Sequence, residues 1–272
     1  MTSGTSIRSA GSSLKALAVA AALGCGAGAS MAADNATLSI TSFSVAAADF
    51  SGNFVWTTDA YQSLDMLALD AGGLHGAQSD TFNAPDWSQG TNRLAQTANA
   101  VATGNTVQLT DAATQLATGG FNLAASATPG SYAPPVLENY ANSSALQSGA
   151  FTLIDENGLA AAGTITFDVY YNLSVMAPSG SGYSQTALNL LSSSDGGGTS
   201  SFGDGLLSSD LAGGNGAMSG HFSWTYTLAA GESAYYTLSG SAIAAAVPEP
   251  GTYALMAFGL AALGAVARRR RG

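Results

Sequence analysis

The sequence predicts an all-β protein: an antiparallel β-sandwich, of jelly-roll or immunoglobulin-like topology, between an N-terminal signal peptide and a C-terminal transmembrane helix. Two observations predict the sandwich. Apolar residues recur at every second position in several stretches, most clearly 165–175 and 222–228, and this period is typical of strands with one buried and one wet face. Glycine-rich turns separate these stretches and helix formers are few, which favours a sandwich over a helical fold.

The N-terminus, residues 1–32, has the order of a secretory signal peptide. Two basic residues precede a short apolar run at 16–23, and small residues then lead to a predicted cleavage site after Ala32. The single cysteine, Cys25, lies inside this segment. Export therefore leaves a mature chain without disulfides, which must be stabilised by its core, its hydrogen bonds or bound ions.

The first half of the body, residues 33–246, contains short strands. In the first, at 36–45, Leu38 and Ile40 alternate with polar residues and the apolar phase then slips to Phe43, which indicates a bulge or the end of the strand. A second short strand is predicted at 53–57. Residues 61–69 fit either a strand or a helical turn.

Three polar or proline-rich stretches interrupt the pattern. Residues 71–100 are predicted to form a long polar loop, 128–135 a loop within one domain, and 192–220 a flexible loop rich in serine, glycine and aspartate. The stretch 164–176 is predicted as a strand, and 222–239 as a β-hairpin.

The charge of the body excludes one class of function. All 17 acidic residues lie between Asp34 and Glu249, and Arg93 is the only basic residue left once both ends are removed. One base against 17 acids gives a mature charge of −16, with Glu249 retained. Such a body lacks the cations that binding nucleic acid requires, and it repels anionic membrane surfaces.

No catalytic constellation stands out, so the body is predicted to be non-enzymatic. The nucleophile, zinc, phosphate-loop and dinucleotide motifs are missing, and His75 and His221 lie far apart in the sequence. Seventeen acids offer many carboxylate pairs for glycoside hydrolysis, and sequence selects none of them. Among the tryptophans, Trp224 alternates with core residues, whereas Trp87 beside Asp86 in a polar stretch is the better candidate for stacking on a sugar ring.

No metal ligand or cofactor is assigned. Asp155, Glu156 and Asn157 in a turn, or Asp195 with Asp204 and Asp210, supply the oxygens that calcium prefers, but neither group has the spacing of a calcium loop. Solvated turn residues are the favoured interpretation, and calcium is kept as an alternative.

The C-terminal segment, 247–272, has three parts. Val247-Pro248-Glu249-Pro250-Gly251 must be extended, because each proline fixes φ and restricts the residue before it. The sixteen uncharged residues 252–267 are at or just under the length that spans a bilayer. Arg268, Arg269, Arg270 and Arg271 follow, and such a cluster stays in the cytoplasm, which places the body outside.

These three parts, in this order, resemble the PEP-CTERM sorting signal of Gram-negative bacteria. The matching residues are Pro248, Glu249, Pro250, the apolar run and the arginine cluster. The resemblance implies recognition by an exosortase, a membrane transpeptidase, after export by the Sec translocon and signal peptidase. It implies transient residence in the inner membrane and delivery to the cell surface or extracellular matrix. An ordinary tail anchor is the alternative.

The resemblance covers only the tail, so several functions of the body stay open. The first is a non-enzymatic surface or matrix protein associated with exopolysaccharide and biofilm. The second is a protein like a carbohydrate-binding module, and the third is a glycosidase. An exposed tryptophan on one sheet face, with affinity for matrix glycan, would favour the second, and two close carboxylates in a groove would favour the third.

Overall fold

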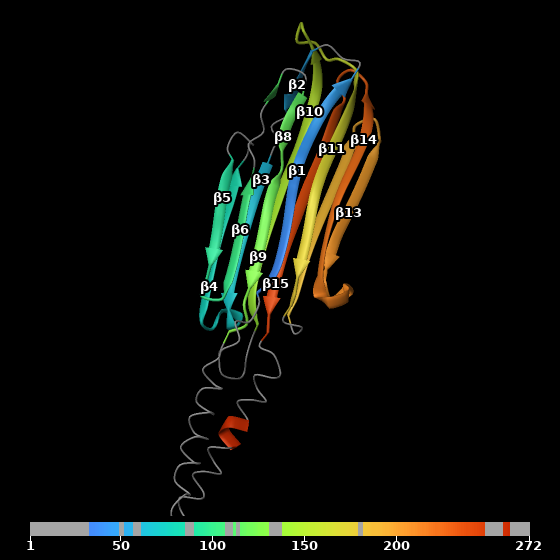
Figure 1. Ribbon diagram of the computed structural model, residues 1–272. Helices are drawn as coiled ribbons and strands as arrows, with labels where there is room; N and C mark the ends of the chain where they lie inside the picture. Colours follow the sequence, from blue (N-terminus) through green and yellow to red (C-terminus); the bar gives the residue numbers. More distant parts are fainter. Residues whose placement is uncertain are drawn as a thin grey trace, which may run out of the picture. The chain divides into compact units, whose positions relative to one another are not determined.

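The computed structural model describes residues 33–48, 52–56, 61–84, 90–106, 111–112, 115–130, 138–178, 182–247 and 258–261. They all belong to the second of two compact units of the chain, which begins at Ala32. The described residues form two antiparallel sheets, so the predicted all-β fold is confirmed (Figure 1). The structure adds three short 3-10 turns: η1 (Ala71–Gly73), η2 (Ser208–Asp210) and η3 (Ala212–Gly214).

The first sheet, called sheet A here, has a continuous path of six strands. In order across the sheet they are β14 (Asn215–Leu228), β11 (Gly163–Met176), β1 (Asp34–Ala48), β9 (Phe121–Ala127), β6 (Ala100–Thr106) and β5 (Thr91–Gln96). Two short strands, β7 (Asp111–Ala112) and β8 (Gln115–Gly119), extend it, and β8 pairs with β1 beyond the end of β9.

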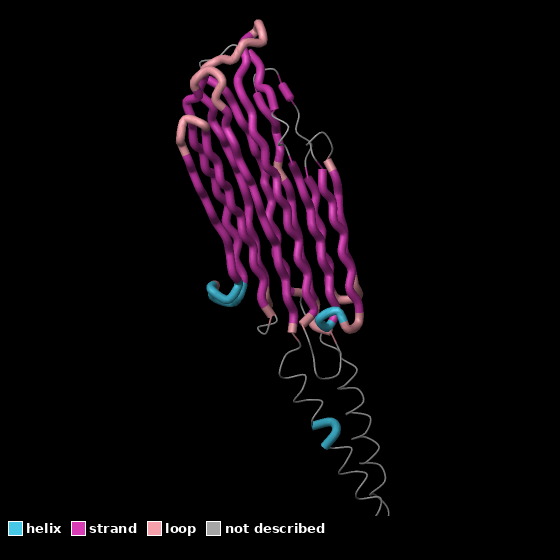
Figure 2. The backbone as a smooth tube through the Cα atoms, turned by 180° about the vertical axis from the view of Figure 1, so that it is seen from behind, coloured by secondary structure: helices cyan, strands magenta, loops and turns pink. Residues whose placement is uncertain are grey.

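The second sheet, sheet B, faces it. In order its path is β13 (Thr199–Leu207), β12 (Tyr183–Ser194), β15 (Ser233–Ala246), β10 (Asn139–Asp155), β3 (Tyr61–Asp70) and β4 (Gly76–Ala84), and β2 (Gly52–Trp56) pairs with the far part of β10. The view from behind shows the strands of both layers running alongside one another (Figure 2).

The core lies between the two sheets, and the period-two pattern places it there. The six alternating apolar residues of the predicted strand 164–176 are buried, from Ile165 to Val175. Aromatic rings from the two sheets meet in the middle: Phe43 of β1 lies 5.2 Å from Tyr236 of β15, and Phe151 of β10 lies 5.9 Å from Phe167 of β11. Burial of these faces is the main favourable term that holds the sheets together.

The chain crosses between the sheets more often than the sequence predicted. The predicted hairpin at 222–239 is wrong, because β14 belongs to sheet A and β15 to sheet B. The turn at 229–232 therefore joins the two layers. From β9 to β12 each strand lies in the sheet opposite to its predecessor, a pattern that alternation alone cannot reveal.

Two predicted loops are largely strands. The stretch 71–100 contains β4 and β5, and the stretch 192–220 contains β13 and the start of β14. These are strands at the sheet edges, and their inward positions carry glycine, aspartate and arginine beside a few apolar residues, so their apolar alternation is weak. Residues 61–69, for which the sequence fitted either a strand or a helical turn, form strand β3.

The phase slip predicted near Phe43 is confirmed as a β-bulge. Ile40 pairs with Tyr171 and Ser42 pairs with Tyr170, so Thr41 is the extra residue in β1. The bulge lets β1 continue to Ala48 with Phe43 and Val45 still fully buried.

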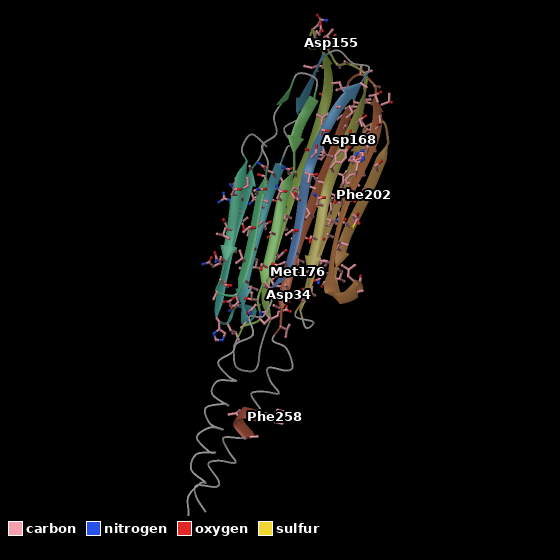
Figure 3. The ribbon with its side chains drawn as sticks, viewed as in Figure 1. Asp34, Asp155, Asp168, Met176, Phe202 and Phe258 are labelled. Carbon is pink, nitrogen blue, oxygen red and sulfur yellow. The ribbon has the colours of Figure 1, made fainter. Side chains whose placement is uncertain are left out.

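The first strand of the sandwich starts, and its last strand finishes, at the same edge of the two sheets along the strand direction. Strand β1 begins at Asp34 and β15 ends at Ala246, and Figure 3 shows Asp34 at the end opposite Asp155. The predicted signal peptide, 1–32, lies outside the described residues. So does the predicted membrane segment 252–267, apart from a helical turn at 258–261. No helix among the described residues is both long enough and apolar enough to cross a membrane.

Candidate functional site

Most of the site residues predicted from the sequence lie outside the described residues. This holds for Trp87 and Asp86, for Pro248, Glu249 and Pro250, and for Arg268, Arg269, Arg270 and Arg271. The structure therefore gives no geometry for their predicted roles, which stay predictions. These roles are ligand contact for the first pair, sorting motif for the prolines and glutamate, and basic stop for the arginines.

Trp224 packs in the core, as its alternation predicted. Its indole stacks on Phe167 at 4.8 Å between ring centroids and on Phe222 at 5.5 Å. Phe222 in turn stacks on Phe202 of β13 at 4.0 Å, which joins the two sheets at this edge. This tryptophan is therefore occupied by packing contacts.

The acidic residues proposed for calcium make contacts within the protein. Asp155 accepts hydrogen bonds from the backbone N–H of Leu159 and Asn157, both at 2.8 Å, and the bond from Leu159 contributes most to lowering the pKa of Asp155. The carboxylate of Asp204 accepts the hydroxyl of Tyr171, whose pKa is raised by burial and by this bond. Across the described ranges no three Asp, Glu, His or Cys residues gather closely enough to hold a metal ion.

His221 lies on the outer face of sheet A, as predicted, but it has close partners. Its ring stacks on Tyr170 of β11, with centroids 3.9 Å apart and planes 10° apart, and its Nε2 lies 3.1 Å from Asp168 Oδ1. Tyr170 is 46% exposed, so this stacked pair presents an aromatic surface to solvent. His75, the other histidine, is exposed in the β3–β4 turn, between η1 and the first residue of β4.

A row of asparagine and serine side chains crosses the whole of sheet A at one register position. Each strand of the path supplies one member, and each is paired with the next in the ladder: Ser219, Asn172, Ser39, Asn122, Asn105 and Asn92, from β14 to β5. At about 4.8 Å between strands, the row is about 24 Å long. It is called the amide row below.

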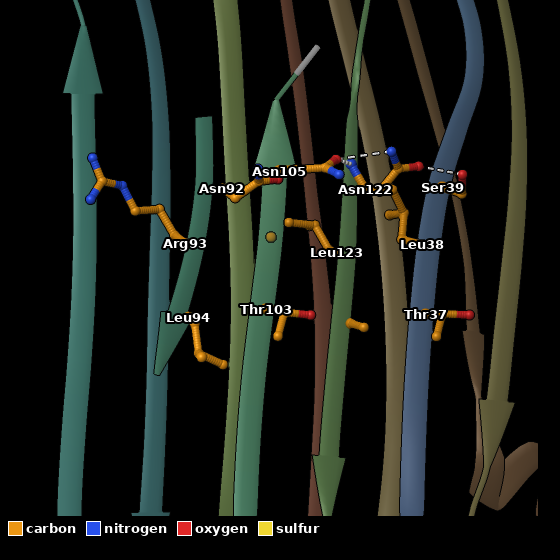
Figure 4. Close-up of a pocket in the computed structure, with 12 residues that line it drawn as sticks. Thr37, Leu38, Ser39, Asn92, Arg93, Leu94, Thr103, Asn105, Asn122 and Leu123 are labelled. Atoms are coloured by element: carbon orange, nitrogen blue, oxygen red, sulfur yellow. Dashed lines mark hydrogen bonds between the residues drawn. The ribbon is translucent and has the colours of Figure 1, made fainter. Parts of the chain in front are cut away.

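Hydrogen bonds join members of the amide row in two groups. The hydroxyl of Ser39 donates to Asn122 Oδ1, and Asn122 Nδ2 donates to Asn105 Oδ1 at 2.9 Å (Figure 4). On the neighbouring strands the hydroxyl of Ser219 donates to Asn172 Oδ1 at 2.5 Å. Within the described part of the chain, Asn105 Nδ2 and Asn172 Nδ2 have no acceptor. The row therefore offers oriented, unused donors to solvent.

The amide row borders a shallow hollow of about 490 Å³ on the outer face of sheet A. Thr37, Thr103 and Leu94, one row further along the strands, complete its floor (Figure 4). No carboxylate lines it. Its single charged residue, Arg93, lies 3.5 Å from Asp80 and over the ring of Phe82, at 5.0 Å from the centroid.

A second hollow, of about 340 Å³, lies on the outer face of sheet B. Serines from β3, β10 and β15 line it, and Asp65 is its only carboxylate. Neither hollow therefore holds the two close carboxylates that glycoside hydrolysis requires.

Sequence reasoning missed the amide row because its members come from six separate strands. In each strand the sequence shows only a polar residue on the wet face, and the register that brings the six together depends on pairing and on the bulge in β1. The exposed Tyr170 was similarly indistinguishable from other wet-face residues.

The C-terminal segment leaves the sandwich directly from a central strand. Ala245 lies between Tyr140 and Tyr183 in sheet B, and Ala246 pairs with Asn139. Burial raises the pKa of Tyr140 and of Tyr183, and Glu138 raises both further. Gly182 lies close against the Asp34 carboxylate and the Ala245 carbonyl, and a side chain at this position would overlap both.

Comparison with known families identifies one segment. The profile of the PEP-CTERM protein-sorting motif matches residues 246–271, so the resemblance of the tail to this signal is confirmed. The match starts at the last residue of β15. Comparisons with curated proteins and with solved structures gave no match.

Proposed function

We propose that this chain, whose tail is a PEP-CTERM protein-sorting motif, is a non-enzymatic protein of the cell surface or extracellular matrix, associated there with exopolysaccharide. The motif indicates export, membrane-anchored sorting in a Gram-negative bacterium and processing by an exosortase. The match at 246–271 is the observation that carries the proposal. A body of −16 without cysteine is consistent with an exported, well-hydrated product.

The position of the motif supports processing at the end of the folded body. Only Val247 separates the last paired residue, Ala246, from Pro248. Since an extended chain spans about 3.3–3.6 Å per residue, the motif begins within about 8 Å of the sandwich. The released product would therefore be the sandwich with almost no C-terminal extension.

Replacing Pro248, Glu249 and Pro250 with alanine tests the sorting step. We expect the variant to stay in the membrane fraction with Arg268–Arg271 attached, whereas the wild-type protein loses its tail. Intact mass of the protein recovered from membranes and from culture medium measures this. Normal processing of the variant would show that the tail is not the signal.

The second part of the proposal is that the sandwich catalyses no reaction. The hollows on the two sheet faces lack paired carboxylates, which argues against the glycosidase alternative. The amide row of sheet A, beside a hollow without carboxylates, favours the carbohydrate-binding alternative instead.

A further inference from the structure

We propose that the outer face of sheet A, along the amide row and the Tyr170–His221 pair, is a binding site for a neutral polysaccharide chain. This deepens the proposed function by naming the ligand class and the face that binds it. The site is defined by Asn92, Asn105, Asn122, Ser39, Asn172 and Ser219 together with Tyr170 and His221.

The charge distribution selects a neutral ligand. The acids of the described residues lie mainly at turns, edges and sheet B: Asp155 and Glu156 in the β10–β11 turn, Asp195 and Glu232 beside the β14–β15 turn, Asp65 on sheet B. The amide row carries none, and Asp168, an acid on the same outer face two residues from Tyr170, lies 3.1 Å from His221 Nε2. A ligand that lies along the row itself need not strip water from any carboxylate, which is the costly step in covering a charged surface. An anionic polysaccharide would instead be repelled by the −16 body.

The chemistry of the row matches hydroxyl groups. A side-chain amide offers donors and an acceptor, and a hydroxyl offers both, so asparagine and serine complement the mixed donor and acceptor character of sugar hydroxyls. The internal bonds from Ser39, Asn122 and Ser219 orient the amides of Asn105 and Asn172 and leave their Nδ2 groups available. Such pre-ordering lowers the entropy cost of binding.

The aromatic pair supplies the apolar contact. Tyr170 and Asn172 are outward-facing neighbours on β11, two residues apart, so the exposed ring stands about 6.6 Å from the row. The stacking of His221 and its contact with Asp168 hold the ring in place. A sugar ring packed on this surface would have its hydroxyls directed along the row, and the 24 Å length of the row, about five strand spacings, accommodates several sugar units.

Affinity electrophoresis of the full chain, in mild detergent where the tail is retained, tests the site. The gels contain dextran, galactomannan or mixed-linkage β-glucan as neutral probes and alginate as the anionic one. We expect at least one neutral probe to retard the chain and alginate to leave it unretarded. Retardation by no neutral probe, or by alginate alone, would overturn the proposal.

Substitutions locate the binding to this face. We expect Tyr170→Ala to lower the affinity about tenfold and Asn172→Ala about threefold to tenfold, from the usual net value of one hydrogen bond or one packed side chain. Thr37→Asp, which adds a carboxylate beside the row, should lower it at least as much. The matched control is Asn189→Ala, an exposed asparagine on the outer face of sheet B, which should bind as wild type.

Two further measurements keep the result decisive. Each variant must unfold at the wild-type temperature, so that weaker binding reflects the site and not the fold. Size-exclusion chromatography tests a second copy of the chain as occupant: a dimer that Tyr170→Ala dissociates, without glycan binding, would assign the face to self-association and overturn the proposal. Failure to bind glycan would contradict this proposal but not the sorting step. Normal processing of the tail variant would contradict the sorting step but not glycan binding, so the two proposals can fail separately.

Discussion

At the residue scale, the core of this protein depends on glycines that face inward. Gly240 of β15 lies beneath Phe121 and Leu38 of sheet A, and an added Cβ would lie 2.6 Å from the Phe121 ring and 3.0 Å from Leu38. Gly104 of β6 has the same relation to Met66 of sheet B, at 2.6 Å. Large side chains on one sheet thus face glycines, which have no side chain, on the other sheet, as close packing requires.

Gly240→Ala should destabilise the protein by about 1–3 kcal/mol, the usual cost of overpacking a full core. The Phe121 ring is fully buried in the packed core, so the added methyl group must displace it or its neighbours. The free energy of unfolding from urea titration measures the effect. Ser241→Ala, one residue along on the outer face, is the control and should change the stability by less than about 0.5 kcal/mol; equal effects of the two substitutions would contradict the prediction.

Burial raises the pKa of the Tyr236 phenol well above its ordinary value. The folded state therefore holds this proton at a pH where the unfolded chain has lost it. Stability is unaffected below about pH 10 and falls as the pH rises beyond it, because the unfolded state then binds fewer protons. Urea midpoints at pH 8 and pH 10.5 should show a loss that is smaller in Tyr236→Phe. An identical loss in that variant would assign the alkaline sensitivity to other groups.

At the element scale, the sequence predicts which face of a strand is buried far better than which strand lies beside it. The residues of β11 and the bulge of β1 follow from local alternation, because side-chain direction has a period of two. The split of β14 and β15 between two sheets does not, since a short turn fits both a hairpin and a crossing. The amide row likewise depends on which strands are neighbours and in which register they pair, so the pattern within single strands could not predict it.

The end of β15 makes an element-scale prediction about processing. A protease or transpeptidase binds several residues of extended chain, whereas only Val247 lies between the paired Ala246 and the motif. Inserting a flexible Gly-Ser segment of about eight residues after Val247 should therefore speed removal of the tail, because the pairs of Ala245 and Ala246 no longer need to open. Pulse-chase followed by gel analysis in the producing cell measures the rate. Slower processing would mean that the exosortase requires the sandwich end itself.

At the scale of the whole molecule, acidic charge is almost uncompensated. The full chain carries −10 at pH 7, and its body carries a single cation, Arg93, already engaged with Asp80 and Phe82. Like charges at the turns and edges repel one another, and this repulsion destabilises the compact state. The same distribution leaves the amide row on the outer face of sheet A without a carboxylate, so a soluble, acidic sandwich still carries an uncharged row of side chains.

This charge predicts that salt stabilises the protein. Raising NaCl from 10 to 150 mM shortens the Debye length from about 30 Å to about 8 Å, which screens repulsion between acids that lie further apart than that. We expect the unfolding temperature at pH 7 to rise by about 2–4 °C for each kcal/mol of repulsion removed. The control is the same series near pH 4.2, where the full chain is close to neutral and the rise should largely vanish. An equal rise at both pH values would point to a general effect of salt on apolar burial instead of charge repulsion.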